Sequence, residues 1–223
     1  MQVLRSGTLI EQLLPRIDFQ NAADSRDATI VRDLVLVSAG VVLVALCAQI
    51  TIPWHPVPLT GQTFAVLLVG GLYGMVRGTI TLAAYFAIGL LGIGVFADGN
   101  NGWDYIQGPT GGYLVGFIVA AGFVGFMAER GLDRKVVPMI GALLIATAII
   151  YLLGAWWLAD WEVPSTGERL GWSAAYTSGV EPFILGDLAK LAAVAGLLPV
   201  GWKIAEKLGL YSRKPDDPSP GVV

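Results

Sequence analysis

The sequence has one cysteine and one histidine among its 223 residues, and only 14% of it is charged. With Cys47 alone, the chain cannot form an intrachain disulfide or a zinc site that needs paired cysteines. His55 has no second histidine with which to complete a metal site, and a lone histidine between Trp54 and Pro56 is more often a loop residue than a base. We therefore expect no metal site, no cofactor and no redox chemistry.

Sequence motifs for catalysis and nucleotide binding are also missing. The chain has no GxSxG, no HExxH and no GxxxxGK[ST] pattern, so it shows no recognisable hydrolase, metalloprotease or phosphate-binding centre. It has no site of its own with which to use ATP. Its basic residues form no patch large enough to indicate nucleic-acid binding, so we expect no nucleic-acid partner.

What the chain has in excess is apolar residues. They make up 55% of the sequence, and the mean hydropathy is +0.66, whereas a soluble domain is about one quarter charged and less than half apolar. A lipid bilayer explains this excess, because a helix in lipid can be hydrophobic on every side. We expect an all-α integral membrane protein.

Six apolar stretches are long enough to cross the hydrocarbon core, which takes roughly 17–25 residues per helix. They are residues 31–50, about 61–76, 78–95, 111–127, 136–158 and 182–201. Arg77 alone separates the second stretch from the third. We therefore predict a bundle of six transmembrane helices that forms one domain over residues 31–207.

The two ends of the chain differ from this domain in composition. Residues 1–30 lack the apolar core of a signal peptide. They are predicted to be a cytoplasmic extension with a short surface helix near residues 9–14. Residues 208–223 are rich in proline and charge and are predicted to be a disordered cytoplasmic tail.

Lysine and arginine are distributed unevenly between alternate loops. They occur before the first predicted span, between the second and third, between the fourth and fifth, and after the last. The loops on the other side are residues 51–60, 96–110 and 159–181. Together they contain one basic residue, Arg169. Because cytoplasmic loops carry the excess of basic residues, we expect both termini to be cytoplasmic and these three loops to face outward.

One pair of ionisable residues lies within a predicted span. Asp187 and Lys190, in the stretch EPFILGDLAKLAAVAG, are three residues apart and so share one face of a helix. Charged residues inside a membrane are costly and usually face a cavity or a partner. The two could form a buried ion pair that holds the last span against its neighbours, or they could bind a ligand. We favour ligand binding, because Pro182 and Gly186 leave room around the start of this helix.

The stretch PWHPVPLTGQTF, residues 53–64, leads into the second predicted span. Its three prolines stiffen an extended entry, since each fixes φ and removes a hydrogen-bond donor. Thr60 and Gln62 then offer uncharged hydrogen-bonding groups at the mouth of the span. Two interpretations remain open: a contribution to a binding site, and a rigid loop in which Thr60 caps the helix.

A glycine-rich, acidic stretch, VFADGNNGWDYIQGPTGGYLVG, separates the third and fourth predicted spans. Its glycines permit backbone conformations that other residues avoid. Its aromatic side chains can cover an apolar ligand, and its amides can bind a polar end. The side chains concerned are Phe96, Trp103, Tyr105, Asn100, Asn101 and Gln107. We predict a lid over an outward-facing pocket, and we include Tyr113 among the substrate-binding residues.

Four motifs, in this order along the chain, carry a resemblance to a known family. They are PVPLTGQTFAVLLVGGLYGMVRG, VFADG, GPTGGYLVGF and GVEPFILGDLAK. With them, about residues 35–207 resemble the BioY family, the biotin-specific substrate-binding components of energy-coupling-factor (ECF) transporters. The resemblance implies a six-helix protein of the cytoplasmic membrane that captures biotin on the outer side and is not an enzyme. It also implies a transmembrane coupling subunit and ATP-binding subunits, supplied by other chains.

The resemblance implies a substrate-binding set as well. The acid and the lysine of the family's last helix belong to its biotin site and match Asp187 and Lys190, and the loop that closes over the vitamin matches residues 96–110. The ureido ring of biotin has one carbonyl acceptor and two N–H donors, which an ammonium and a carboxylate can satisfy together. The valerate carboxylate of biotin would prefer amides near the lid, such as Asn100 or Asn101.

Three other functions remain open. A protein of this architecture could bind another vitamin, it could be an intramembrane enzyme that uses Asp187 as a base, or it could have a purely structural role in the membrane. Tight binding of biotin that leaves the vitamin unmodified would separate these alternatives.

Overall fold

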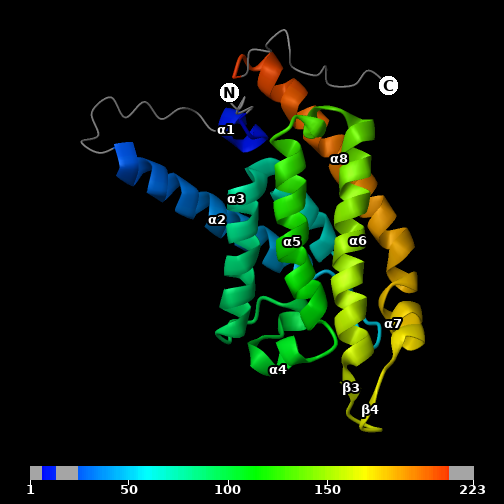
Figure 1. Ribbon diagram of the computed structural model, residues 1–223. Coiled ribbons are helices and arrows are strands. Elements are labelled where there is room, and N and C mark those ends of the chain that lie inside the picture. Colours follow the sequence, from blue (N-terminus) through cyan, green and yellow to red (C-terminus); the bar gives the residue numbers. More distant parts are fainter. Residues whose placement is uncertain (1–6, 14–24, 211–223) are drawn as a thin grey trace, which may run out of the picture.

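The computed structural model describes residues 7–13 and 25–210 of the chain. Within these residues it is an α-helical bundle with two short β-hairpins (Figure 1). The long helices are α2 (Ser25–Ala48), α3 (Gln62–Leu90), α5 (Gly111–Ala128), α6 (Val136–Asp160) and α8 (Ile184–Lys207). Five stretches are long and apolar enough to cross a membrane, and the last of them, Trp172–Lys207, joins α7 (Trp172–Gly179) and the 3-10 turn η3 (Glu181–Phe183) to α8. The expected helical architecture with membrane-length segments is confirmed.

The helix α3 contains a sharp reversal at Gly74. This residue has φ 82° and ψ −179°, a conformation that is open to glycine and strained for any side chain. A hydrogen bond joins the segments before and after Gly74: the Gln62 amide donates to the Tyr85 hydroxyl (2.8 Å). A Cβ on Gly78 would lie 3.3 Å from the Cα of Gly70, whereas residues eight positions apart in a straight helix are separated by about 12 Å. The helix therefore consists of two antiparallel arms.

The reversal lies three residues before Arg77, where the sequence predicts the boundary between the second and third spans. It separates a first arm, residues 62–73, from a second arm, residues 75–90. Just after the reversal, the Met75 backbone N–H donates to the Glu129 carboxylate (2.8 Å). The predicted boundary is wrong because the reversal depends on the φ and ψ of Gly74, a combination that glycine adopts without strain. Arg77 lies three residues beyond the reversal.

Glycines bring α3 and α5 into backbone contact. A Cβ on Gly70 would lie 2.7 Å from the Ala121 carbonyl oxygen, and a Cβ on Gly125 would lie 2.2 Å from the Gly74 carbonyl carbon. A larger side chain does not fit at these distances, so the two helices approach more closely than helices with larger residues can. This contact fixes the first arm of α3 against α5 and so positions its N-terminal end.

The helix α2 leans away from the other long helices over part of its length (Figure 1). Large apolar side chains along it are exposed, with Val35 at 62% and Leu46 at 63%. Such a surface is unfavourable in water and is accommodated by lipid. The helix begins at Ser25, earlier than the predicted residue 31, so it includes residues that precede the apolar run.

Short elements connect the long helices. They are β1 (Thr51–Ile52), β2 (Leu59–Thr60), η1 (Ala97–Gly99), α4 (Gly102–Gln107), η2 (Leu132–Arg134), β3 (Glu162–Val163) and β4 (Glu168–Arg169). β1 pairs with β2 and β3 pairs with β4, both antiparallel. The predicted third span extends to residue 95, but α3 ends at Leu90, because Gly92 has φ 95° and cannot continue the helix.

The helix α1 (Leu9–Leu13) lies against α3 and α8. Leu9 is 1% exposed, and its side chain fills the space beside Gly201, where a Cβ would lie 2.5 Å from Leu9 Cδ2. The helix predicted near residues 9–14 is therefore present, but it is docked on the bundle through a buried leucine. Residues 25–30 of the predicted extension are the first residues of α2. Of the rest of the extension and the tail, residues 1–6, 14–24 and 211–223 lie outside the described residues.

Candidate substrate-binding site

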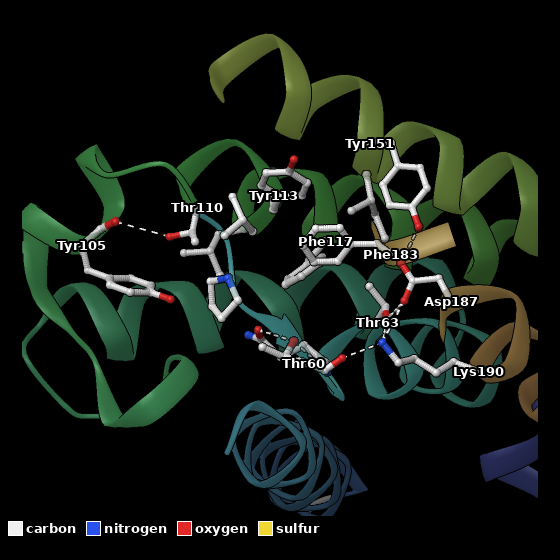
Figure 2. Close-up of a pocket in the computed structure, with 15 residues that line it drawn as sticks. Thr60, Thr63, Tyr105, Thr110, Tyr113, Phe117, Tyr151, Phe183, Asp187 and Lys190 are labelled. Atoms are coloured by element: carbon white, nitrogen blue, oxygen red, sulfur yellow. Dashed lines mark hydrogen bonds and ion pairs between the residues drawn. The ribbon is translucent and has the colours of Figure 1, made fainter. Parts of the chain in front are cut away.

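A cavity lies between the β1–β2 hairpin, the first arm of α3, α5, α6 and the start of α8 (Figure 2). The space between these elements is about 480 Å³, and this figure includes a part that is open to the surroundings. Asp187 and Lys190 lie at one end of the cavity, and Tyr105 and Thr110 lie at the other (Figure 2). Aromatic rings lie between the two ends, so the cavity has a charged end and an apolar middle.

The Asp187 carboxylate is buried, with 4% of the residue exposed. Its Oδ1 accepts hydrogen bonds from the Thr63 hydroxyl (2.7 Å) and the Lys190 ammonium (2.8 Å). Its Oδ2 accepts one from the Tyr151 hydroxyl (2.7 Å). A buried carboxylate is tolerated only when it is paired and hydrogen-bonded. Donors from α3, α6 and α8 provide this compensation and fix the orientation of the carboxylate.

The Lys190 ammonium uses all three of its N–H donors. Besides its bond to Asp187, it donates to the Thr60 carbonyl (2.6 Å) and to the Thr63 hydroxyl (3.1 Å). The Thr60 carbonyl is within reach because the strand β2 ends at this residue, just before α3 begins. The ion pair therefore joins α8 to α3, and at the same time it lines the cavity.

Thr60 and Gln62 form a small hydrogen-bonded network at the start of α3. The Thr60 hydroxyl accepts a hydrogen bond from the Gln62 backbone N–H (3.2 Å) and donates one to the Gln62 side-chain oxygen (2.9 Å). The amide of Gln62 donates to Tyr85, whose hydroxyl donates to the Val95 carbonyl (2.9 Å). The prediction that Thr60 caps α3 is wrong, because Gly61 is the N-cap residue. The Thr60 hydroxyl instead forms a local turn with Gln62, and the Thr60 carbonyl accepts from Lys190 at the charged end.

Aromatic rings line the middle of the cavity. The rings of Tyr113 and Phe183 have centroids 6.4 Å apart and planes 24° apart. The Tyr113 hydroxyl donates to the Gly179 carbonyl (2.7 Å), which turns it away from the cavity and leaves the ring to line it. Phe117 lies beside Phe183 (Figure 2). The middle of the cavity therefore suits an apolar group.

The predicted lid contributes Tyr105 to the cavity. Phe96 stacks on Tyr105 with ring centroids 5.3 Å apart. It is itself buried and lies against Gly89, where a Cβ would come within 2.1 Å of the Phe96 ring. Phe96 thus supports Tyr105 from behind and is not among the residues that line the cavity.

The predicted site residues fall into two groups. Those that line the cavity are Thr60, Gln62, Tyr113, Asp187 and Lys190. Those that do not are Phe96, Asn100 and Asn101. The Asn100 amide donates to the Ala97 carbonyl (2.8 Å) within its own loop, and Asn101 directly precedes α4. Asparagines are frequent in such loops because they form local hydrogen bonds with the backbone, and this local role explains their position here.

Sequence reasoning missed Thr63, Tyr151 and Phe117, which also line the cavity. The sequence indicates such residues only indirectly: a carboxylate inside a span, such as Asp187, needs hydrogen-bond donors from neighbouring helices. The apolar run of α6 contains the hydroxyls of Thr147 and Tyr151, and the sequence alone does not say which of them faces Asp187. Phe117 gave no signal, because apolar residues occupy every face of α5.

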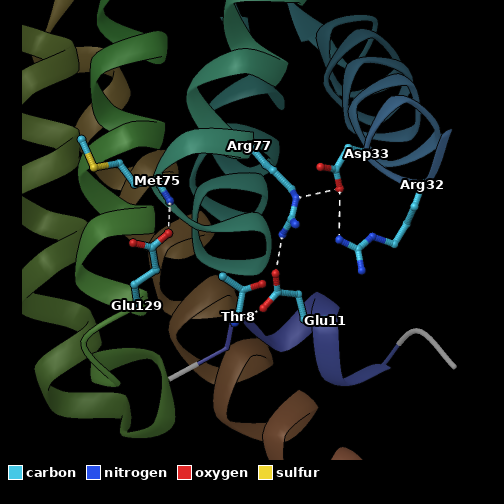
Figure 3. A network of polar contacts seen from close by, with 7 residues as sticks. All are labelled: Thr8, Glu11, Arg32, Asp33, Met75, Arg77 and Glu129. Carbon is cyan, nitrogen blue, oxygen red and sulfur yellow. Dashed lines mark hydrogen bonds and ion pairs between the residues drawn. The ribbon is translucent and has the colours of Figure 1, made fainter. Parts of the chain in front are cut away.

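A second polar network lies beside the reversal that joins the two arms of α3 (Figure 3). Arg77 donates to Glu11 of α1 through Nη1 (2.8 Å) and to Asp33 of α2 through Nε (3.0 Å). It therefore ties α1 and α2 to the turn of α3. These side chains are not among the described residues that line the cavity.

Long apolar helices around a cavity with one charged end define a helical membrane protein with a polar cavity inside its bundle. Residues 19–207 match the model of the BioY family. The chain belongs to the BioY family.

Relatives from several organisms cover most of the same region. "Probable biotin transporter BioY" of Pyrococcus horikoshii is 37% identical over 161 residues, which cover 72% of this chain and 90% of the relative. "Biotin transporter BioY" of Thermotoga maritima is 35% identical, again over 72% of this chain and 90% of the relative. The crystal structure of "the S-component for biotin from an ECF-type ABC transporter" is similar with a TM-score of 0.66 and 25% identity, covering 82% of this chain and 95% of that chain.

Proposed function

We propose that the protein captures biotin for uptake across the cell membrane, as the substrate-binding component of an ECF-type transporter. It is a multi-pass membrane protein and not an enzyme. The observation that carries this conclusion is the Asp187–Lys190 pair at the charged end of the cavity, in a chain that belongs to the BioY family. The relatives named as biotin transporters support the choice of biotin.

In the proposed complex, the ureido ring of biotin lies at the charged end of the cavity. A carboxylate has about four acceptor positions, and Asp187 uses three of them, so one remains for a ureido N–H. The ureido carbonyl accepts a hydrogen bond from Lys190, which can turn one N–H away from the Thr63 hydroxyl, its longest bond at 3.1 Å. The sulfur-containing ring and the valerate chain then lie along Phe117 and the other aromatic rings.

Residues 96–110 form the proposed lid over this site. Tyr105 covers the cavity, and Phe96 supports it. Gly99 and Gly102 have φ of 73° and 84° and flank the turn that leads into α4, so they are suited to act as hinges. In this proposal Asn100 and Asn101 reach the ligand only when the loop changes position.

The proposed topology has six membrane crossings and cytoplasmic termini. The crossing segments are α2, α5, α6, α8 and the two arms of α3. The arms, residues 62–73 and 75–90, are shorter than a lipid-exposed span, but much of their surface is buried against the other helices. Residues 1–30 and 208–223 flank this domain on the cytoplasmic side. The distribution of basic residues supports the orientation. In a Cys47→Ala background, Asn101→Cys should react with an impermeant thiol reagent on intact cells, whereas Lys207→Cys should react only after lysis. The reverse pattern would overturn the orientation.

The source of energy for uptake lies outside this chain. Because the sequence has no phosphate-binding loop, we assign ATP hydrolysis to separate ATP-binding subunits and their connection to this protein to a transmembrane coupling subunit. The similarity to an ECF-type S-component supports this assignment. Biotin binding to the isolated chain should therefore need no nucleotide.

The proposed function is tested by identifying what the chain carries. The protein is purified from cells supplied with a mixture of vitamins, and the small molecule bound to it is identified by mass spectrometry. The expected result is biotin of unaltered mass. Another vitamin, or a chemically altered biotin, would contradict the proposal and favour a different transport substrate or an intramembrane enzyme.

A further inference from the structure

Among the described residues, none that lines the end of the cavity near Tyr105 and Thr110 is positively charged. Val57 and Pro58 line the cavity with them, and Lys190 is the one cation among the described residues that line it. Lys190 lies at the other end (Figure 2). Biotin carries a carboxylate at the end of its valerate chain, so the end of the cavity that receives this carboxylate decides which derivatives the site can bind.

The charged end does not suit a second carboxylate. Lys190 is neutralised by Asp187 at 2.8 Å, and its three N–H donors already have partners. A ligand carboxylate at Lys190 would lie next to Asp187, and two carboxylates so close together repel each other strongly in a poorly solvated place. A ureido group is neutral and offers donors to Asp187 and an acceptor to Lys190. The ureido ring therefore takes the charged end, and the valerate chain points to the Tyr105 end.

The loops around the Tyr105 end carry a negative balance of charge. Among the loops 51–60, 96–110 and 159–181, Arg169 is the single lysine or arginine, and this side chain is 73% exposed and paired with Asp160 at 2.6 Å. The acidic residues of the same loops are Asp98, Asp104, Asp160, Glu162, Glu168 and Glu181. Long-range electrostatics therefore do not favour an anionic tail at this end.

The groups that the Tyr105 end does offer are neutral. Burial raises the pKa of the Tyr105 phenol, so its hydroxyl stays protonated, and Thr110 adds a second hydroxyl beside the start of α5 at Gly111. A hydroxyl donates a stronger hydrogen bond to a carboxylate than to an amide or ester carbonyl, but a ligand carboxylate also loses more solvation when it leaves water, and this loss opposes the stronger bond. A helix N-terminus raises the affinity for a carboxylate over that for an uncharged amide or ester by only about 2- to 5-fold. A charge-assisted hydrogen bond to a cation would raise it by about 10- to 150-fold.

We infer that this site accepts biotin whose carboxylate has been converted to an uncharged amide or ester, and that it binds these derivatives nearly as well as the free acid. The inference rests on the proposed function and names its substrate class: compounds with the biotin ring system and either a charged or an uncharged tail. The ureido ring and the apolar middle provide recognition, and the charge of the tail contributes little.

Competition on the purified full chain tests this inference. Radiolabelled biotin is displaced by biotin, by biotinamide, by biotin methyl ester, and by a biotin methylated on a ureido nitrogen. The amide and the ester should bind within about 10-fold of biotin, and the ureido-methylated compound should bind more than about 10-fold more weakly. An amide that binds more than 10-fold more weakly, or a ureido-methylated compound that binds like biotin, would overturn the inference. Failure of radiolabelled biotin itself to bind would refute the proposed function instead.

A variant that adds the missing cation provides a second test. Thr110→Lys places an ammonium at the Tyr105 end, and Thr110→Met is the matched neutral control. The lysine variant should prefer biotin over biotinamide by at least about 10-fold more than the methionine variant does. Equal preferences in the two variants would show that the valerate tail does not lie near Thr110. The competition on the unchanged chain decides the inference even where neither variant folds.

Discussion

Replacing Asp187 with asparagine removes the negative charge from the cavity and nearly preserves the shape of the side chain. The amide oxygen of Asp187→Asn can still accept a hydrogen bond from Lys190 or Thr63. The amide NH₂ replaces the oxygen that now accepts from Tyr151, and Lys190 loses its counter-ion. A ureido N–H of the ligand then meets a neutral amide in place of a charged acceptor.

The size of the effect follows from the hydrogen bonds concerned. One charge-assisted hydrogen bond contributes roughly 1.5–3 kcal/mol, so Asp187→Asn should weaken biotin binding about 10- to 150-fold. Tyr151→Phe removes a neutral donor and leaves the charge, which corresponds to roughly 0.5–1.5 kcal/mol and a smaller loss. Lys190→Met should weaken binding about as much as Asp187→Asn. The double variant should lose less than the sum, because both side chains bind one ligand group.

The assay measures biotin affinity and melting temperature on the same set of proteins. Leu188→Val, on α8 at a position that is 46% exposed, is the control and should change neither quantity appreciably. If the Asp187–Lys190 pair only holds α8 against α3, the variants should melt at lower temperature and bind biotin normally while folded. Normal affinity in a destabilised Asp187→Asn protein would refute the site assignment.

Further predictions concern the backbone and a buried acid. Gly74→Ala should destabilise the fold by roughly 1–3 kcal/mol because of its positive φ, whereas Gly141→Ala, at an open helical position, should not; equal melting temperatures would contradict this. Gly99→Ala and Gly102→Ala should slow both association and dissociation of biotin, and unchanged rates would refute the lid. Burial raises the pKa of Asp133 to about 7, while an exposed aspartate titrates near 3.9. The folded protein therefore keeps a proton that the unfolded chain loses, and melting temperature should fall as pH rises from about 4 to about 7. Asp133→Asn should remove this fall in melting temperature. If the variant shows the same fall as the unchanged protein, the assignment of the fall to Asp133 is wrong.

The ends of a helix could be predicted from the sequence where an apolar run stops at polar residues. The predicted spans 111–127 and 136–158 correspond to α5 and α6 with the same first residues and nearly the same last ones. The prediction failed at the α3 reversal, because Gly74 occurs in an apolar run where glycines also serve helix packing. The β1–β2 hairpin and α4 could not be predicted from hydropathy, since these short elements depend on their surroundings.

The candidate site could be predicted where a residue type is unusual for its place. Asp187 and Lys190 stand out because charge is costly inside an apolar span. Tyr151 and Phe117 do not stand out, because their role depends on which helices are neighbours and how each is rotated. Asn100 was predicted to bind the substrate because its loop is rich in glycine and aromatic residues. Its amide instead donates a local hydrogen bond to the backbone of the same loop.

Calorimetric titration of the purified chain with biotin tests the central claim most directly. The measurement is made without nucleotide and without other subunits, because every group assigned to the site belongs to this chain. The account predicts saturable binding of one biotin per chain that a biotin methylated on a ureido nitrogen does not reproduce. The absence of heat from binding, together with no retention of radiolabelled biotin by the folded protein, would contradict it.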